Sequence, residues 1–152
     1  MPTFRERPYG QFNFWVNLGG EGSDPLKPDA GFQEISALGM EVGMAEYRYG
    51  NHKLNNTLKV PGLGKSSPDV TLKRGVMGSA TVYKWFDLIR NGHNEMRTVR
   101  IELRNEANTD TVQTWVLQGA RVIKFVQGPL NAKSNEIAME ELTISFERME
   151  IQ

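Results

Sequence analysis

The chain has 152 residues, no cysteine and 18 acidic against 18 basic side chains, so its formal net charge is zero. This length suits one domain and is short for two. A dedicated nucleic-acid binder normally carries a basic excess for phosphate contacts, which is missing here, and the lack of cysteine excludes disulfides and thiolate chemistry. Hydrophobic residues make up 39% and glycines number 15, which predicts a turn-rich β-protein that gains from burying surface against copies of itself.

Residues 1–10 mix charged residues with prolines and contain no apolar stretch, so we predict an N-terminal arm and no signal peptide. No apolar run in the sequence approaches the roughly 18 residues of a membrane span. We therefore expect residues 11–152 to form a single β-domain of a soluble protein that is made in the cytoplasm and does not insert directly into a membrane.

The first predicted strands occupy residues 11–18 and 32–48, and a loop rich in proline, glycine and aspartate separates them. In the second of these regions bulky apolar side chains alternate with small or charged ones, a period of two that a strand separates onto two faces. We expect the apolar row, from Leu38 to Met44, to face the core. The opposite row consists of Gly39, Glu41, Gly43 and Ala45.

A polar, turn-rich segment follows and predicts an exposed loop because it has no apolar period. It consists of Tyr49, Gly50, Asn51, His52, Lys53, Leu54, Asn55, Asn56 and Thr57. A short apolar segment at residues 58–61 and an alternating strand at residues 70–73 come next.

The period then changes to that of a helix. Apolar residues stand at the i, i+3, i+4 and i+7 positions of one helical face, namely Val82, Trp85, Phe86 and Ile89. Ser79 is the expected N-cap, and Asn91 with Gly92 is the expected stop. We expect Trp85 and Phe86 to anchor this helix to the sheets.

The rest of the chain is predicted to be strands. Residues 99–103 alternate as a half-buried strand, and residues 112–126 form two strands broken or bulged near Gly119. The last strand covers residues 136–147, and its apolar parity changes across Glu140 and Glu141, which predicts a bulge or a crossing between sheets. The result is one mostly antiparallel β-domain with a single helix.

One segment, Gly62 to Ser66, looks like the end of a phosphate-binding loop. The full pattern also needs a glycine five residues before Gly64, where Lys59 stands, and a following helix. Pro68 and a strand pattern follow instead, so we interpret the segment as a simple turn.

Other candidate sites are equally weak. His52 and His93 are the only histidines and lie in separate loops, so no zinc-ligand set is present. Glu140 and Glu141 are adjacent on a strand and point to opposite faces, which prevents joint acid–base work. The aromatic residues could line a ligand pocket or pack in the core, and core packing is the favoured interpretation. This aromatic set consists of Phe12, Phe14, Trp15, Trp85, Phe86 and Trp115. The sequence predicts no catalytic, cofactor or metal site.

A series of short motifs runs through nearly the whole chain, each weak alone but informative in order and spacing. They are FNFWV at 12–16, GFQEIS at 31–36, YRYGN at 47–51, LKVPG at 58–62, VTLKRG at 70–75, the helix residue Trp85, WVLQGA at 115–120, NAKSNE at 131–136 and MEEL at 139–142. Together they resemble the tail-tube (inner-tube) family of contractile bacteriophages, tailocins and phage-like extracellular contractile injection systems.

The resemblance implies a mainly β fold, an antiparallel β-barrel or sandwich with one flanking α-helix. It also implies a structural subunit, not an enzyme and without cofactors, whose hexameric rings stack into a hollow tube. A contractile sheath would drive this tube through a target envelope, and its lumen would conduct cargo, either a protein effector or DNA. The implied partners are other copies of the chain, sheath protein, and baseplate and tube-initiator proteins of a phage tail or phage-like particle.

Relatives carry a long loop at residues 49–57 that reaches the neighbouring ring, so we expect this segment to form the contact between rings; an ordinary solvated loop is the alternative. Glu41, Gly43 and Ala45 are expected to face the lumen, because small and polar side chains suit a wet surface. For the whole chain, the alternatives are a ring-forming tube protein of a type VI secretion system and a monomeric β-barrel that binds a small ligand. An enzyme is a third and has no supporting motif.

Overall fold

The computed structural model describes residues 6–20, 31–48, 50, 51, 53, 57–66, 69–76 and 80–152. Their helix and strands are, in chain order, β1 Phe14–Asn17, β2 Glu34–Ile35, β3 Met40–Tyr47, β4 Leu58–Ser66, β5 Val70–Gly75, α1 Thr81–Arg90, β6 Arg97–Arg104, β7 Thr111–Gln127, β8 Met139–Ser145 and β9 Arg148–Ile151. Every strand pairing is antiparallel. The mainly β class with one helix is therefore confirmed.

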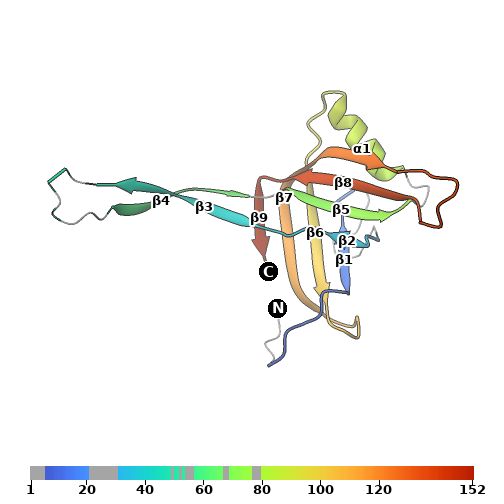
Figure 1. The fold of residues 1–152 in the computed structure, drawn as a ribbon, viewed down its shortest axis with the longest axis horizontal. Coiled ribbons are helices and arrows are strands. Elements are labelled where there is room, and N and C mark those ends of the chain that lie inside the picture. Colours follow the sequence, from blue (N-terminus) through green and yellow to red (C-terminus); the bar gives the residue numbers. More distant parts are fainter. Residues whose placement is uncertain are drawn as a thin grey trace.

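The body consists of two crossing layers that share the long strand β7 (Figure 1). In the first layer the early part of β7 lies between β6 and β9, and β1 adds to β6. In the second layer the late part of β7 pairs with β8, followed by β5 and β2. The predicted division into two strands was wrong, because β7 is continuous. The predicted bulge near Gly119 is supported, since the pairing with β6 shifts register between Leu117 and Ala120, where the partners of β7 change.

Gly119 marks this change of layer. Its φ is +65°, which a glycine adopts at little cost. A Cβ built there would lie 2.8 Å from a carboxylate oxygen of Glu147. The glycine therefore lets β7 bend into the second layer and lets the segment between β8 and β9 pass close to it.

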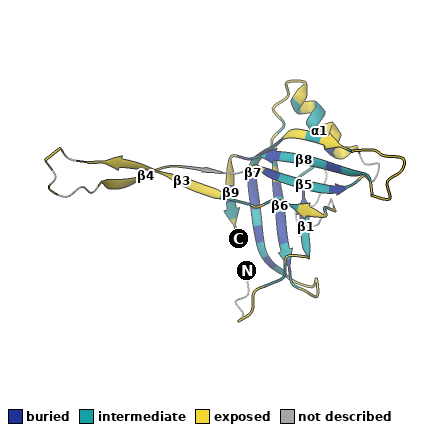
Figure 2. Ribbon diagram, in the orientation of Figure 1, coloured by how far each residue is buried: buried dark blue, intermediate teal, exposed yellow. Residues whose placement is uncertain are grey.

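The core fills the space between the layers and under the helix. Leu72, Leu117, Leu142 and Ile144 come from three strands, β5, β7 and β8, and are almost wholly buried. The exposure pattern along the ribbon shows the same centre (Figure 2).

Helix α1 closes one side of this core, because Val82 and Trp85 are buried against it. The predicted stop is confirmed: Asn91 is the C-cap residue and Gly92 has φ +92°. The N-cap prediction was wrong, since Ala80 occupies that position without a side-chain hydrogen bond. Ser79 itself lies outside the described residues.

The predicted bulge at Glu140 and Glu141 was also wrong. Pairing between β5 and β8 runs without a break from Val70–Ile144 to Gly75–Met139. Glu140 lies on the core side and forms an ion pair with Arg74. Burial of a paired carboxylate, and not a bulge, explains the apparent change of parity.

Several predicted strand boundaries shift, including that of the last strand, which was expected at residues 136–147 and is β8 at Met139–Ser145. The first strand is shorter than residues 11–18, and the region 32–48 divides into β2 and β3. The turn expected at residues 62–66 is strand instead, as part of β4. Strands β3 and β4 pair with each other as a separate two-stranded sheet, which projects from the body as a long arm (Figure 1).

Candidate assembly interface

The β3–β4 hairpin is the most exposed part of the described chain. All eight residues of β3 are exposed, and the arm stands clear of both layers of the body (Figure 2). An isolated two-stranded hairpin is marginally stable in water and normally needs a further strand or a packing surface. The described residues of the same subunit give it almost none, so the hairpin is a candidate surface for association.

The apolar face of the hairpin carries Met40, Val42 and Met44 at alternate positions of β3. Their side chains are 54%, 57% and 53% exposed. The expectation that this row faces the core was therefore wrong for these three residues, whereas Leu38 does pack against the core. Period-two alternation predicts that one face is covered, but it does not say which copy of the chain covers it.

The opposite face carries the predicted lumen residues Glu41, Gly43 and Ala45. Backbone pairing sets Glu41 across from Lys65 and Ala45 across from Val60. All of β3 and Val60 of β4 are exposed, but nothing among the described residues identifies a lumen, so this assignment stays a prediction.

The tip of the hairpin holds the predicted inter-ring contact. Gly50, Asn51, Lys53 and Thr57 are described and exposed, while Tyr49, His52, Leu54, Asn55 and Asn56 lie outside the described residues. Just before the tip, Tyr47 and Leu58 form an exposed cross-strand pair, 57% and 49% exposed. The contact between rings also stays a prediction.

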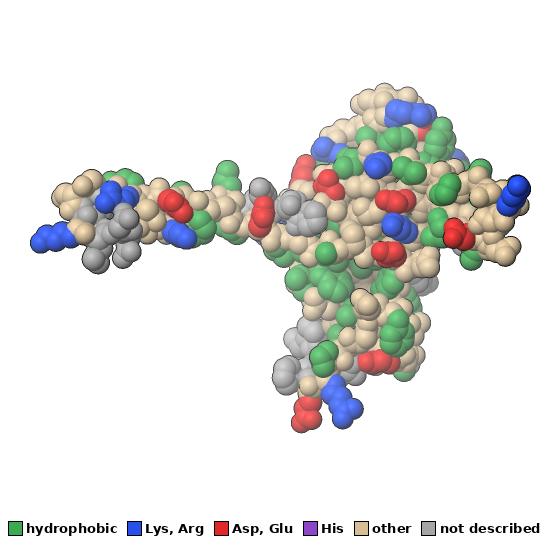
Figure 3. All heavy atoms as spheres, in the orientation of Figure 1, with side chains coloured by type: hydrophobic (Ala, Val, Ile, Leu, Met, Phe, Trp, Pro, Cys, Tyr) green, Lys and Arg blue, Asp and Glu red, His purple; other side chains and the backbone are tan. Residues whose placement is uncertain are grey.

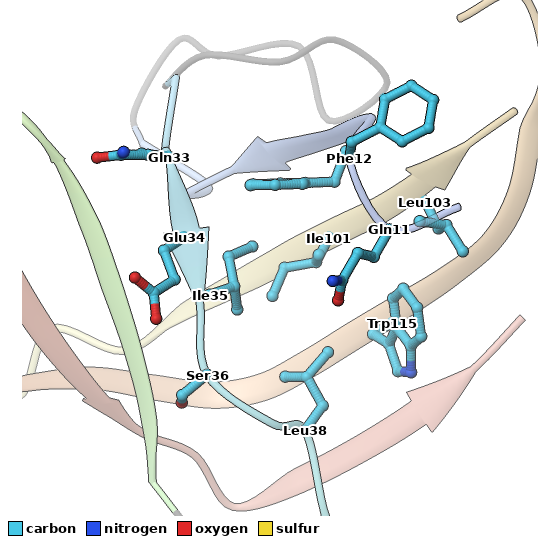
Figure 4. A pocket seen from close by; sticks show the side chains of 11 residues that line it. Gln11, Phe12, Gln33, Glu34, Ile35, Ser36, Leu38, Ile101, Leu103 and Trp115 are labelled. Atoms are coloured by element: carbon cyan, nitrogen blue, oxygen red, sulfur yellow. The ribbon is translucent and has the colours of Figure 1, made fainter. Parts of the chain in front are cut away.

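An apolar groove of about 710 Å³ opens between β1, β6, β7 and the β2 segment. Ile35, Leu38 and Ile101 converge on it from three segments (Figure 4). Polar side chains also line it, and Gln11 lies among Ile101, Leu103 and Trp115 (Figure 4). The full lining is Gln11, Phe12, Phe14, Gln33, Glu34, Ile35, Ser36, Leu38, Ile101, Leu103 and Trp115.

This groove alters the interpretation of the aromatic set. Phe14 and Trp115 pack against the core but also line the groove. Phe12 is 66% exposed, so the core-packing prediction was wrong for that residue. Sequence spacing gave no signal for the groove, because its walls come from segments far apart in the chain.

The outward face of the second layer is polar and balanced in charge. Lys73 of β5 stands opposite Glu34 of β2 on one side and Glu141 of β8 on the other. Acidic and basic groups alternate over β8, β5 and β2 (Figure 3). Opposite charges at neighbouring cross-strand positions stabilise a sheet modestly, and here they leave the face without a single dominant sign.

Strands at the ends of the first layer leave open edges. β1 pairs with β6 alone and β9 with β7 alone among the described residues. Because successive strands are antiparallel, β1 and β9 run in opposite directions. A rotated copy could therefore continue the antiparallel order across such an edge, and closure into a ring removes exposed edges.

The two predicted helix anchors differ in burial. Trp85 is completely buried, and its Nε1 donates a hydrogen bond to the carbonyl of Glu95 at 3.0 Å. Phe86 is half-buried and packs beside Phe125, with ring centroids 6.3 Å apart.

Groups with catalytic potential do not converge within the described part of the chain. His93 is exposed in the turn after α1, and His52 lies outside the described residues. Among the described residues, no cluster of three or more metal-ligating side chains is found. Their one helix is too short and too polar to cross a membrane.

Solved structures with the same architecture are subunits of tubular injection machines. One comes from the cryo-EM structure of an extracellular contractile injection system, the PVC sheath–tube complex in its extended state. It matches with a TM-score of 0.81 and 28% sequence identity, and the match covers 97% of this chain and 93% of that one. Another, from the cryo-EM structure of the anti-feeding prophage tube-terminating cap, has a TM-score of 0.82 and 29% identity, covering 100% and 95%. The fold and its projecting hairpin thus define a tube-subunit class of β-protein.

The family follows from the sequence itself. The model of the T4-like virus tail tube protein gp19 family matches residues 10–150, and the chain belongs to that family. Among curated protein sequences, no match was found. The predicted function as a tail tube protein of the contractile injection class is confirmed. A type six secretion system protein shares the fold at a TM-score of 0.55 with 13% identity, covering 91% of this chain and 81% of that one.

Proposed function

We propose that this tail tube protein forms hexameric rings that stack into a hollow tube inside a contractile sheath. The observation that carries the proposal is the β3–β4 hairpin, whose exposed apolar row has no covering surface among the described residues of its own subunit. Contiguous apolar surface of this kind marks a site of association. The open edges of β1 and β9 supply a second means of joining copies.

The proposed lumen wall combines two surfaces. One is the face of the hairpin with Glu41, Gly43 and Ala45; the other is the outward face of the second layer around Lys73 and Glu141. On the second of these surfaces, acidic and basic positions face each other: Lys73 lies opposite Glu34 and Glu141. A wall of paired charges exerts little net field, so a protein effector or DNA could pass without being held.

The proposed partners are the components that surround and hold the tube in a contractile injection system. Copies of the chain stack through the hairpin tip at residues 49–57, sheath protein surrounds the tube, and baseplate and tube-initiator proteins hold its end. The similar structures come from a sheath–tube complex, a tube-terminating cap and a baseplate. The subunit would be made in the cytoplasm and incorporated into the particle there, and it would act without catalysis, metal or cofactor.

The direct test is gel filtration of the purified protein combined with negative-stain imaging. We expect rings or tubes of uniform width. A protein that stays monomeric at high concentration, and that is not found in rings within particle preparations, would contradict the proposal.

A further inference from the structure

We propose that Met40 and Met44 form a redox-sensitive modification site, and that their oxidation to methionine sulfoxide keeps a free subunit out of the tube. The two thioethers lie on the apolar face of the β3–β4 hairpin, on either side of Val42, and both side chains are more than half exposed. This inference rests on the proposed tube function and adds a chemical condition that a subunit must meet before it can assemble.

Sulfur chemistry in this chain belongs to methionine, because the sequence has seven methionines and no cysteine. The other described methionines lie on the body, where Met149 is buried and Met139 is half-buried. Met96 is 46% exposed, but its Sδ accepts a hydrogen bond from Nη2 of Arg121 at 2.9 Å. Among the described residues, an oxidant therefore meets two exposed thioethers together on one strand face.

The reaction transfers one oxygen atom from hydrogen peroxide to the thioether. A lone pair of the sulfur attacks one peroxide oxygen, the O–O bond breaks and an S–O bond forms. The proton on the transferred oxygen passes to the departing hydroxide, which leaves as water. The sulfur loses two electrons and the peroxide gains them. The product is a polar, chiral sulfoxide in place of an apolar side chain, and methionine sulfoxide reductases reverse the change.

The position of the two methionines makes this change costly for assembly and not for folding. All of β3 is exposed in the subunit, so the added oxygens stay hydrated there. In the proposed tube the apolar face is covered, and a sulfoxide would lose its hydration without gaining a hydrogen bond. Interfaces rich in methionine are disrupted by oxidation for this reason. The same burial would shield both sulfurs from peroxide once the tube has formed.

Hydrogen peroxide treatment of the unassembled subunit tests the site, with peptide mass spectrometry to locate the added oxygen. We expect oxidation of Met40 and Met44 but not of Met149. The critical concentration for assembly should rise at least about tenfold, equivalent to about 1.4 kcal/mol, with an unchanged circular dichroism spectrum. Methionine sulfoxide reductases supplied with a dithiol should restore assembly. Peroxide added to finished tubes should leave Met40 and Met44 largely unoxidised.

The matched control is the double variant Met40→Leu with Met44→Leu, which keeps the face apolar and retains Met96. It should assemble like the parent both before and after peroxide treatment. The double variant Met40→Gln with Met44→Gln places a polar oxygen at the same positions without any oxidant. It should assemble as poorly as the oxidised parent. Val42→Asp, which adds a charge between the two positions, should assemble poorly as well.

The outcomes separate this site from the tube function. Three results would overturn the site while an untreated parent that forms tubes leaves the tube function standing. These are hairpin methionines that stay unoxidised in the free subunit, oxidised methionines with undiminished assembly, and an equal loss of assembly in the leucine double variant. An untreated parent that forms neither rings nor tubes would overturn both proposals.

Discussion

Trp85 is the side chain that holds the helix to the body. Its ring is fully buried, its Nε1 donates to the carbonyl of Glu95, and the Cζ atom of Arg97 lies 4.7 Å from its ring centroid. We predict that Trp85→Ala lowers the free energy of unfolding by about 3–5 kcal/mol, measured in urea melts of the unassembled subunit. Phe86→Ala should cost clearly less, because Phe86 is only half-buried. Equal losses of unfolding free energy would mean that Trp85 and Phe86 contribute equally to holding the helix against the sheets.

Glu140 and Arg74 form the buried charge pair of the second layer, and their side chains are 3% and 10% exposed. Gln127 Nε2 donates to Glu140 Oε2 at 3.0 Å, whereas Arg74 Nη2 is buried without a hydrogen-bond partner. Removing one member of such a pair leaves the other charge buried and uncompensated. The pair therefore depends on Glu140 remaining a carboxylate.

The prediction for this pair is that Glu140→Gln destabilises the subunit by about 3–5 kcal/mol. Thermal or urea unfolding of the unassembled protein measures it. Glu141→Gln is the matched control, since Glu141 is the next residue on the outward face and its loss should stay within about 1 kcal/mol. A Glu140 variant as stable as the Glu141 variant would show that the buried pair contributes nothing.

At the scale of elements, the sequence correctly predicted the elements that depend on neighbouring residues in the chain. The helix and its stop at Asn91 and Gly92 followed from a 3.6-residue period and a glycine with positive φ. The bulge at Glu140 was predicted wrongly, because a buried carboxylate looks like a surface residue until its partner, 66 positions away, is known. Charge pairing across strands is not visible in local periodicity.

The candidate interface was only partly predictable, because local periodicity does not show which surface covers an apolar face. Alternation identified Met40, Val42 and Met44 as one apolar face, but assigned that face to the core of its own subunit. In a protein that assembles, apolar residues are buried both in the core of the subunit and between subunits, and the sequence pattern does not distinguish the two. Only the structure shows that the hairpin leaves the body and that a groove opens beside Ile101.

The hairpin tip provides a prediction for an element. Replacing residues 51–56 with a two-residue turn containing glycine should leave the fold intact, because loop length has a modest entropic effect. Rings should still form, since the body and the base of the hairpin are unchanged, while long tubes should not. Imaging of the variant beside the parent measures this. Full-length tubes from the shortened variant would place the contact between rings elsewhere.

At the scale of the whole molecule, the subunit combines a buried apolar core with a large exposed apolar surface on the hairpin. Leu72, Leu117 and Ile144 are buried within the body, yet Val42, Leu63 and other apolar side chains of the hairpin remain open to solvent, Leu63 at 92%. The formal net charge of zero adds little repulsion between copies. Both properties are unfavourable for a protein that remains a monomer and favourable for one that assembles.

Assembly should therefore contribute to stability by mass action. A partner that binds only the folded state raises the apparent stability, and the effect grows with concentration. We predict that the midpoint of thermal unfolding rises with protein concentration for the parent, followed by circular dichroism across a hundredfold range.

The Val42→Asp subunit is the comparison for this measurement. It should unfold at a midpoint independent of concentration, close to that of the parent at high dilution, because its core is untouched and only the hairpin contact is lost. If the parent also unfolds at a constant midpoint while light scattering shows tubes, then the tubes dissociate before unfolding and the hairpin contact contributes little to the stability of the fold. A variant that melts well below the diluted parent would instead place Val42 in the subunit's own stability, against its 57% exposure in the structure.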